Sequence, residues 1–154
     1  MIRTFFAIVV LSLLMTACQN DVVFSDYKTF DDILWQKVDQ PEFSFDIEKE
    51  QRVEVAIVYR LIYGYPYMNM KSNVVFNNET NKKHVYQLDF QVRNEDKSYK
   101  GEIMGDFIDV RHILLADTVL ANGRYNIKVE ETLEEETLPF VMEVGVEVKK
   151  IDLK

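Results

Sequence analysis

Apolar and polar side chains alternate along most of this chain with a period of two, the pattern of strands that bury one face and expose the other. The clearest example is residues 52–63, where six apolar residues share one parity: Val53, Val55, Ile57, Tyr59, Leu61 and Tyr63. The same alternation recurs at residues 84–93, 124–130 and 140–150, and less regularly at 22–27, 43–47 and 70–76. The pattern therefore predicts about seven strands.

Turn-forming residues separate these segments, among them Pro41, Gly64 to Pro66 and Asn122-Gly123. Residues 106–116 are the exception, because their apolar positions have the spacing of a helix: Phe107, Val110, Ile113 and Leu114. We expect a short helix or an irregular crossover there. Many short alternating strands without long helices between them predict an all-β fold, an antiparallel β-sandwich.

The first residues, MIRTFFAIVVLSLLMTAC, have the organisation of a secretory signal: Arg3 precedes an apolar run that ends in small residues. The run is too short for a membrane-spanning helix, which needs about 20 apolar residues. Met15-Thr16-Ala17-Cys18 resembles a bacterial lipobox, in which the peptide is cut before the cysteine and the cysteine is acylated. We expect a lipoprotein signal peptide at residues 1–17, an acylated Cys18 with a short tether over residues 18–24, and a single domain over 25–154.

Acyl chains on Cys18 would hold the mature protein on a membrane of the cell envelope. Gln19 follows the cysteine where an inner-membrane retention aspartate could have stood, which by analogy with other Gram-negative bacteria favours the outer membrane. The leaflet is left open.

The amino-acid composition of the chain disfavours several classes of function. The chain has 154 residues, with 18 Lys and Arg against 26 Asp and Glu, so its net charge of -8 opposes nucleic-acid binding. One cysteine, two histidines and five glycines offer no disulfide framework, no metal-ligand spacing and no phosphate loop. We expect no metal, no cofactor and no enzymatic activity.

Carboxylates remain the one catalytic possibility. Residues 130–136 contain five glutamates, which we interpret as a solvated acidic hairpin. The separation of paired carboxylates is a property of the fold, so the sequence leaves that alternative open.

The most distinctive stretch is residues 59–70, where four tyrosines surround Gly64 and Pro66 at the exit of the clearest strand. Tyr59 and Tyr63 share the core parity and are expected to pack inside. Tyr65 and Tyr67 are candidates for binding a partner or ligand, because a tyrosine ring offers apolar area with a hydrogen-bonding tip. Arg60, Asn69 and Trp35 complete the candidate set.

The order of several motifs resembles the gliding-motility lipoprotein family GldH of the Bacteroidetes. The matching residues are Cys18, Trp35, Phe43, Arg60, Tyr65-Pro66-Tyr67, Asn69, Gly123, Tyr125 and Val144-Gly145-Val146. The resemblance implies a membrane-attached accessory lipoprotein of the gliding apparatus, which in these bacteria is tied to type IX secretion. The family pattern has a glycine before the last strand, where this chain has Pro139-Phe140.

Two hypotheses follow. The first is a non-catalytic component that binds other gliding and secretion proteins of the envelope. The alternative is a lipid-anchored module that binds a glycan or peptide through exposed Tyr65, Tyr67 and Trp35. A ligand module should show a concave aromatic patch, whereas an assembly component should show an uncovered sheet edge or a flat apolar patch.

Overall fold

The structure, a computed structural model, describes residues 21–80 and 83–152. Its elements in chain order are β1 (Val22–Thr29), the 3-10 turn η1 (Asp31–Ile33), β2 (Leu34–Gln36), β3 (Glu42–Ile47), β4 (Gln51–Ile62), β5 (Asn69–Asn78), β6 (Lys83–Gln91), β7 (Glu102–Met104), β8 (Phe107–Leu120), β9 (Gly123–Glu131), β10 (Thr137–Pro139) and β11 (Val141–Lys150).

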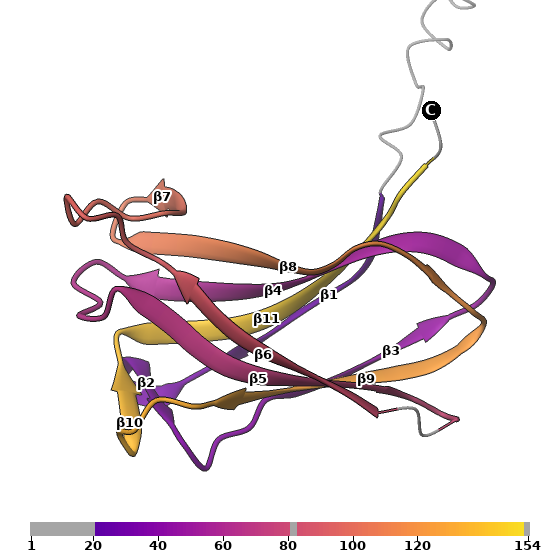
Figure 1. Cartoon of the computed structure of the whole chain (residues 1–154), viewed down its shortest axis with the longest axis horizontal. Helices are drawn as coiled ribbons and strands as arrows, with labels where there is room; N and C mark the ends of the chain where they lie inside the picture. The colour runs from indigo at the N-terminus through magenta and orange to yellow at the C-terminus, as the bar shows by residue number, and fades with distance from the viewer. Residues whose placement is uncertain (1–20, 81–82, 153–154) are drawn as a thin grey trace, which may run out of the picture.

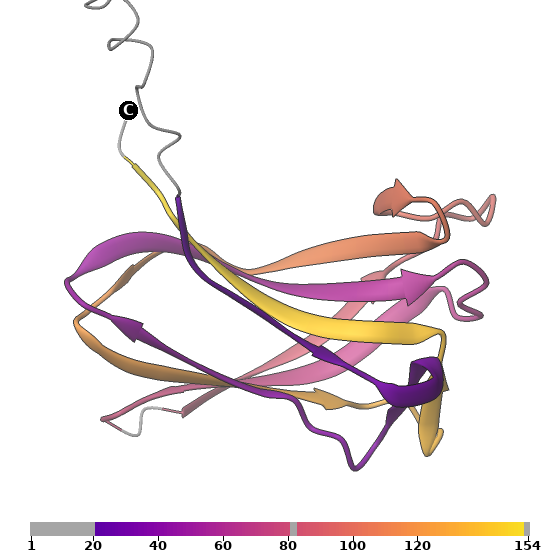
Figure 2. The same cartoon turned by 180° about the vertical axis from the view of Figure 1, so that it is seen from behind.

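Two antiparallel sheets face each other and form a sandwich (Figures 1 and 2). One has the strand order β1-β11-β4-β8-β7 and the other the order β3-β9-β5-β6. The short strands β2 and β10 pair with each other at one end of the sandwich (Figure 1). The predicted antiparallel β-sandwich is confirmed.

The core lies between the sheets and consists of the inward parity of each long strand. In β4 these are the odd-numbered residues from Val53 to Leu61, all of which are buried. Aromatic rings connect the layers, as where Phe45 of β3 stacks on Tyr125 of β9 at 5.7 Å. Burial of these apolar faces is the main force that holds the two sheets together.

All seven segments predicted as strands from alternation are strands: β1, β3, β4, β5, β6, β9 and β11. The described residues contain four more strands, β2, β7, β8 and β10. Three of these are only three residues long, too short to display a period of two.

The helix or crossover expected at residues 106–116 is wrong, because this segment belongs to the 14-residue strand β8. Its register against β4 shifts twice, between Val53 and Val55 and again between Val55 and Ala56. Each shift inserts an extra residue into β8, as in a β-bulge. Apolar side chains also lie on both faces, with Phe107 and Ile113 exposed and Val110 buried, so their combined spacing resembles that of a helix.

The two ends of the described chain lie side by side. The backbone N–H of Lys150 donates to the carbonyl of Asp21 at 2.7 Å, and Val22 is the register partner of Lys149 (Figure 1). Strand β1 thus begins within the stretch expected to form the tether. The expected signal peptide and Cys18 lie outside the described residues. Within the described ranges, no helix is long and apolar enough to cross a bilayer.

Candidate functional site

The Tyr-rich loop turns the chain from β4 to β5. Gly64 adopts φ +111°, a conformation that favours glycine, and the Tyr65 N–H donates to the carbonyl of Ile62. This turn places the ring of Tyr65 inside the sandwich, where it is fully buried and its hydroxyl donates to the carbonyl of Asn69 at 3.2 Å. Burial raises the pKa of Tyr65. The ring of Tyr67 meets Tyr65 edge-on at 5.5 Å and packs half-buried against the core.

Trp35 on β2 is also fully buried. Its indole Nε1 donates to the carbonyl of Asp39 at 2.7 Å, and its ring stacks on Phe30 at 5.3 Å. The aromatic ligand platform expected at Trp35 and Tyr65 is therefore contradicted for these two side chains, because both are part of the core. Trp35 lies in a strand of only three residues, which is too short for an alternation that would predict where its side chain points.

Arg60 lies on the outer face of the five-stranded sheet. Its Nε and Nη2 each donate to a carboxylate oxygen of Asp109 at 2.8 Å, and its Nη1 donates to Glu143 at 2.9 Å. Hydrogen bonding to Asp109 raises the pKa of Arg60. Its two partners belong to the strands on either side of β4, so the guanidinium ties β8, β4 and β11 together on this face.

Asn69 lies on the other sheet, where its side-chain amide donates to Asp89 at 2.6 Å. The structure thus brings Tyr65, Tyr67 and Asn69 near one turn, but it places Arg60 on an outer face and Trp35 in the core. The predicted residues do not converge on one site.

Tyr63 is the most exposed of the four tyrosines in this stretch. Its expected burial is wrong, because 65% of the residue is exposed. Strand β4 ends at Ile62, so Tyr63 no longer follows the alternation that directs odd-numbered residues inward. Its backbone N–H donates instead to the carbonyl of Asp106 at 2.9 Å. The ring lies 5.4 Å from that of Tyr99, whose hydroxyl accepts from the N–H of Gly64.

Tyr63 belongs to a group of apolar side chains at this end of the five-stranded sheet. Ile62, Phe107 and Met104 are successive register partners across β4, β8 and β7, so they lie side by side on one face. Phe140 approaches the same corner, because its carbonyl accepts from the N–H of Ile62. We call the five residues Ile62, Tyr63, Met104, Phe107 and Phe140 the apolar end surface.

Exposure of this surface is substantial: 46% for Met104, 38% for Phe107 and 41% for Phe140. Phe140 also has φ +65°, a left-handed conformation that is costly for a bulky residue. Its ring covers Gly64, where an added β-carbon would lie 3.3 Å from the Phe140 ring.

A charged row lies two residues further along the same strands, on the same face as the row of Ile62, Phe107 and Met104. Glu143, Arg60, Asp109 and Glu102 are consecutive partners across β11, β4, β8 and β7. Three carboxylates thus face one guanidinium, and Asp106 adds another at the β7–β8 turn. The neighbourhood of the apolar end surface is acidic.

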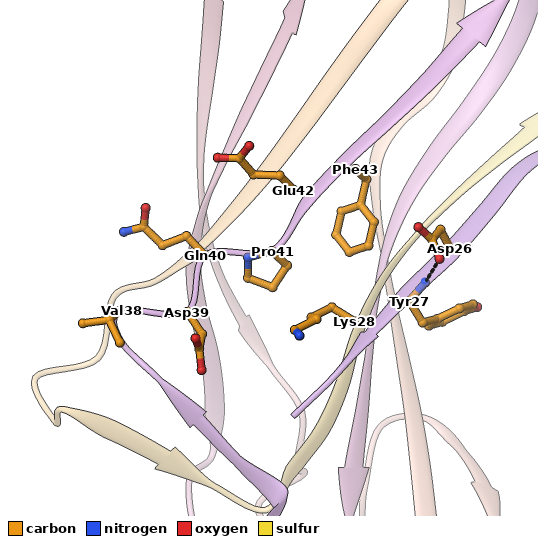
Figure 3. Close-up of a pocket in the computed structure, with 9 residues that line it drawn as sticks. All are labelled: Asp26, Tyr27, Lys28, Val38, Asp39, Gln40, Pro41, Glu42 and Phe43. Atoms are coloured by element: carbon orange, nitrogen blue, oxygen red, sulfur yellow. Dashed lines mark hydrogen bonds between the residues drawn. The ribbon is translucent and has the colours of Figure 1, made fainter. Parts of the chain in front are cut away.

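A hollow of about 350 Å³ lies between the edge strands β1 and β3 (Figure 3). Its lining residues are Asp26, Tyr27, Lys28, Val38, Asp39, Gln40, Pro41, Glu42 and Phe43. Three carboxylates accompany one lysine, and no histidine, cysteine, serine or threonine lines it. The residues that line it therefore contain no Ser-His or Cys-His pair.

The two histidines lie on different sheets, His84 on β6 and His112 on β8. The ring of His112 stacks on Phe90 at 4.5 Å, and burial lowers its pKa. His84 lies beside Tyr86, with ring centroids 6.4 Å apart. Within the described part of the chain, no group of three or more His, Cys, Asp or Glu side chains is arranged to hold a metal ion.

Glu131 corrects the interpretation of the acidic run as wholly solvated. Residues 134–136 are exposed, but Glu131 is only 4% exposed, because it takes the inward parity of β9. One carboxylate oxygen accepts from the N–H of Leu133, and the other has no hydrogen-bond partner among the described residues. Burial raises the pKa of this group.

Sequence reasoning did not identify Met104, Phe107 or Phe140 as surface residues. The spacing around Phe107 predicts a short helix or an irregular crossover, and the three-residue strand β7 has no period that would orient Met104. At Phe140 the only signal in the sequence is that Pro139-Phe140 stands before the last strand, where the family pattern has a glycine.

The model of the GldH lipoprotein family matches residues 22–148 of this chain. A search of curated proteins found no match.

Several solved structures are similar in fold. The pre-peptidase C-terminal domain of a collagenase from Bacillus anthracis is 13% identical, with a TM-score of 0.40 over 83% of this chain and 90% of that chain. Xyl-CBM35, in complex with a disaccharide containing glucuronic acid, is 12% identical, with a TM-score of 0.40 over 89% and 96%. PliG of Salmonella Typhimurium, a periplasmic inhibitor of g-type lysozyme, is 14% identical, with a TM-score of 0.36 over 89% and 93%. Similarities of this size carry no argument about function.

Proposed function

The chain belongs to the GldH lipoprotein family, and from this premise we propose that it is a membrane-anchored, non-catalytic accessory component of the gliding-motility machinery that is linked to type IX secretion. The family match over residues 22–148 is the observation that carries the proposal, since it spans nearly the whole described domain. The anchor is Cys18, acylated after removal of residues 1–17, in the outer membrane.

The proposed mechanism is positional. An acylated cysteine confines the domain to a membrane surface, and this raises its effective concentration for partners in the same envelope. High intrinsic affinity is then unnecessary. The domain itself acts as a rigid adaptor, because two packed sheets hold its surface residues in fixed relative positions.

The arrangement of aromatic side chains favours this proposal over a glycan-binding module. Trp35 and Tyr65 would have to leave the core to stack on a sugar ring, which would remove their buried hydrogen bonds to Asp39 and Asn69. The apolar end surface instead gathers outward-facing apolar side chains, among them Met104 and Phe107, at one end of the five-stranded sheet.

Affinity purification from solubilised envelope tests the proposal, with the tagged full-length protein compared against Cys18→Ala. We expect the intact protein to retain gliding and secretion components and the variant to lose them. Equal recovery with both proteins, or recovery of polysaccharide alone, would contradict the proposed function.

A further inference from the structure

The apolar end surface combines exposure with backbone strain. Phe140 has φ +65° and is 41% exposed, so deep burial of its side chain does not hold it in this conformation. A bulky residue in the left-handed region costs on the order of 1–3 kcal/mol, and such conformations cluster at functional sites. A contiguous, strained and exposed apolar surface indicates a site of interaction.

The position of this surface relative to the chain's start argues against the bilayer as its occupant. It lies at the Val141 end of β11, whereas Val22 pairs with Lys149 at the opposite end. Ten residues of strand span about 33 Å. The four peptide units from Cys18 to Val22 can reach at most about 14 Å, so an acyl anchor at Cys18 would lie nearer to the start of β1 than to this surface. The start of β1 and strand β7 lie toward opposite ends of the sheet (Figures 1 and 2).

Charge defines the chemistry of the partner. The row beside the surface carries Glu102, Asp109 and Glu143 against Arg60, and Arg60 is already saturated by two of these carboxylates. Lys100, Arg111 and Lys149 line a hollow together with Glu102 and Asp109. The Lys100 ammonium donates to Gln91, whereas Arg111 and Lys149 pair with carboxylates outside the row, Glu54 and Glu147. A partner with basic residues at its margin would complement this excess.

The same charges disfavour a second copy of the chain. A twofold interface centred on this surface would bring two identical acidic rows toward each other. Like charges facing each other across an interface are unfavourable, and they serve to exclude wrong partners.

We infer that the apolar end surface is the docking site for a different envelope protein, whose contact region has an apolar centre and a basic margin. Phe107, Met104 and Phe140 supply the apolar contact, and the Glu102, Asp109 and Glu143 carboxylates supply the charge. This inference rests on the proposed function and names the surface through which the protein would act.

Site-specific photocrosslinking in cells tests the inference with the full-length, anchored protein. A benzophenone amino acid replaces Phe107 in one protein and Val119 in a control. Val119 lies on the same strand and is more exposed, at 56%, but it lies at the opposite end. We expect a discrete protein adduct from position 107, with crosslinked peptides that contain Lys or Arg beside apolar residues, and at least tenfold less of that adduct from position 119.

A second variant controls for damage to the fold. Met104→Asp changes a short edge strand and is expected to reduce the adduct from position 107 at least tenfold, whereas Val119→Asp leaves it unchanged. The apolar end surface is not the proposed docking site if position 107 gives no protein adduct or gives the same adducts as position 119. Crosslinking to lipid or to a second copy of the chain would also contradict the inference.

The two proposals fail separately. If the Cys18→Ala protein still supports gliding and secretion, the proposed function is wrong, whatever the crosslinks show. If the Met104→Asp and Val119→Asp proteins give the same amount of the adduct, only the inference about the docking surface is wrong.

Discussion

The ring of Tyr27 lies flat against Gly145, so close that a β-carbon at Gly145 would overlap the ring atoms. The two residues are register partners on β1 and β11, and the Tyr27 hydroxyl continues along the outer face to donate to Glu147 at 2.8 Å. This contact gives a physical reason for the glycine in the Val144-Gly145-Val146 sequence. Any larger residue would displace the edge strand's tyrosine.

Replacement of this glycine tests the contact. Gly145→Ala should lower the free energy of unfolding by about 1–3 kcal/mol, because the added methyl overpacks the Tyr27 ring. In a Tyr27→Ala background the same change should be neutral or slightly stabilising, since alanine restricts the unfolded chain more than glycine does. Urea unfolding of the four proteins measures the coupling, and strictly additive losses would contradict it.

A buried hydrogen bond joins the two sheets between the hydroxyls of Tyr59 and Ser72, 2.6 Å apart. Tyr59→Phe should lower stability by about 1–3 kcal/mol, because it leaves the Ser72 hydroxyl buried without a partner. Tyr59→Phe combined with Ser72→Ala removes both polar groups and should recover much of the loss. If the double variant is less stable than either single variant, the hydrogen bond does not have this role.

The ion pairs of Arg60 should contribute more than those of Arg52 on the same strand. Arg60→Ala leaves two half-buried carboxylates without their charged donor and should cost about 2–4 kcal/mol. Arg52 pairs with Asp117 at an exposed position, so Arg52→Ala should have a much smaller effect. Equal losses in thermal unfolding would show that burial does not distinguish the two pairs.

Glu131 predicts a specific dependence of stability on pH. Burial raises the pKa of Glu131 in the folded protein, so the folded state holds this proton more tightly than the unfolded state. Its contribution to stability is present below the ordinary value of 4.5 and is lost as pH rises through the folded pKa.

Glu131→Gln replaces the carboxylate with a neutral group and should make the protein more stable than wild type at pH 7, with the difference shrinking toward pH 4. Lys37, Glu135 and Glu136 also act on this carboxylate and are unchanged in the variant. Glu130→Gln, on the outward parity beside Lys128, is the control and should not show this trend. Chemical unfolding across that pH range measures both variants, and a constant difference for Glu131→Gln would refute the assignment.

The sequence predicts a large part of the fold because alternation over six or more residues determines both the strand and the face that it buries. It does so for β4, where the odd-numbered residues through Leu61 are inside. It does not predict β8, because two bulges and the exposed apolar residues Phe107 and Ile113 disrupt the period.

The candidate site is less predictable, because side chains at strand ends and in loops have no fixed parity. Tyr63 follows the last paired residue of β4 and turns outward, while Tyr65 is directed inward by the Gly64 turn. Phe140 has a positive φ, a backbone conformation that favours glycine and that the hydrophobic pattern does not indicate. The side chain that this protein carries at that position contributes to an exposed surface, which no pattern of hydrophobicity would indicate.

The central claim is that one acylated cysteine fastens this β-sandwich to the envelope. Mass spectrometry of the protein purified from envelope membranes tests it most directly, through the mass of its N-terminal peptide. The account predicts a peptide that begins at Cys18 and carries diacylglycerol and an acylated amine. A peptide that retains residues 1–17, or an unmodified Cys18 in protein released without detergent, would contradict it.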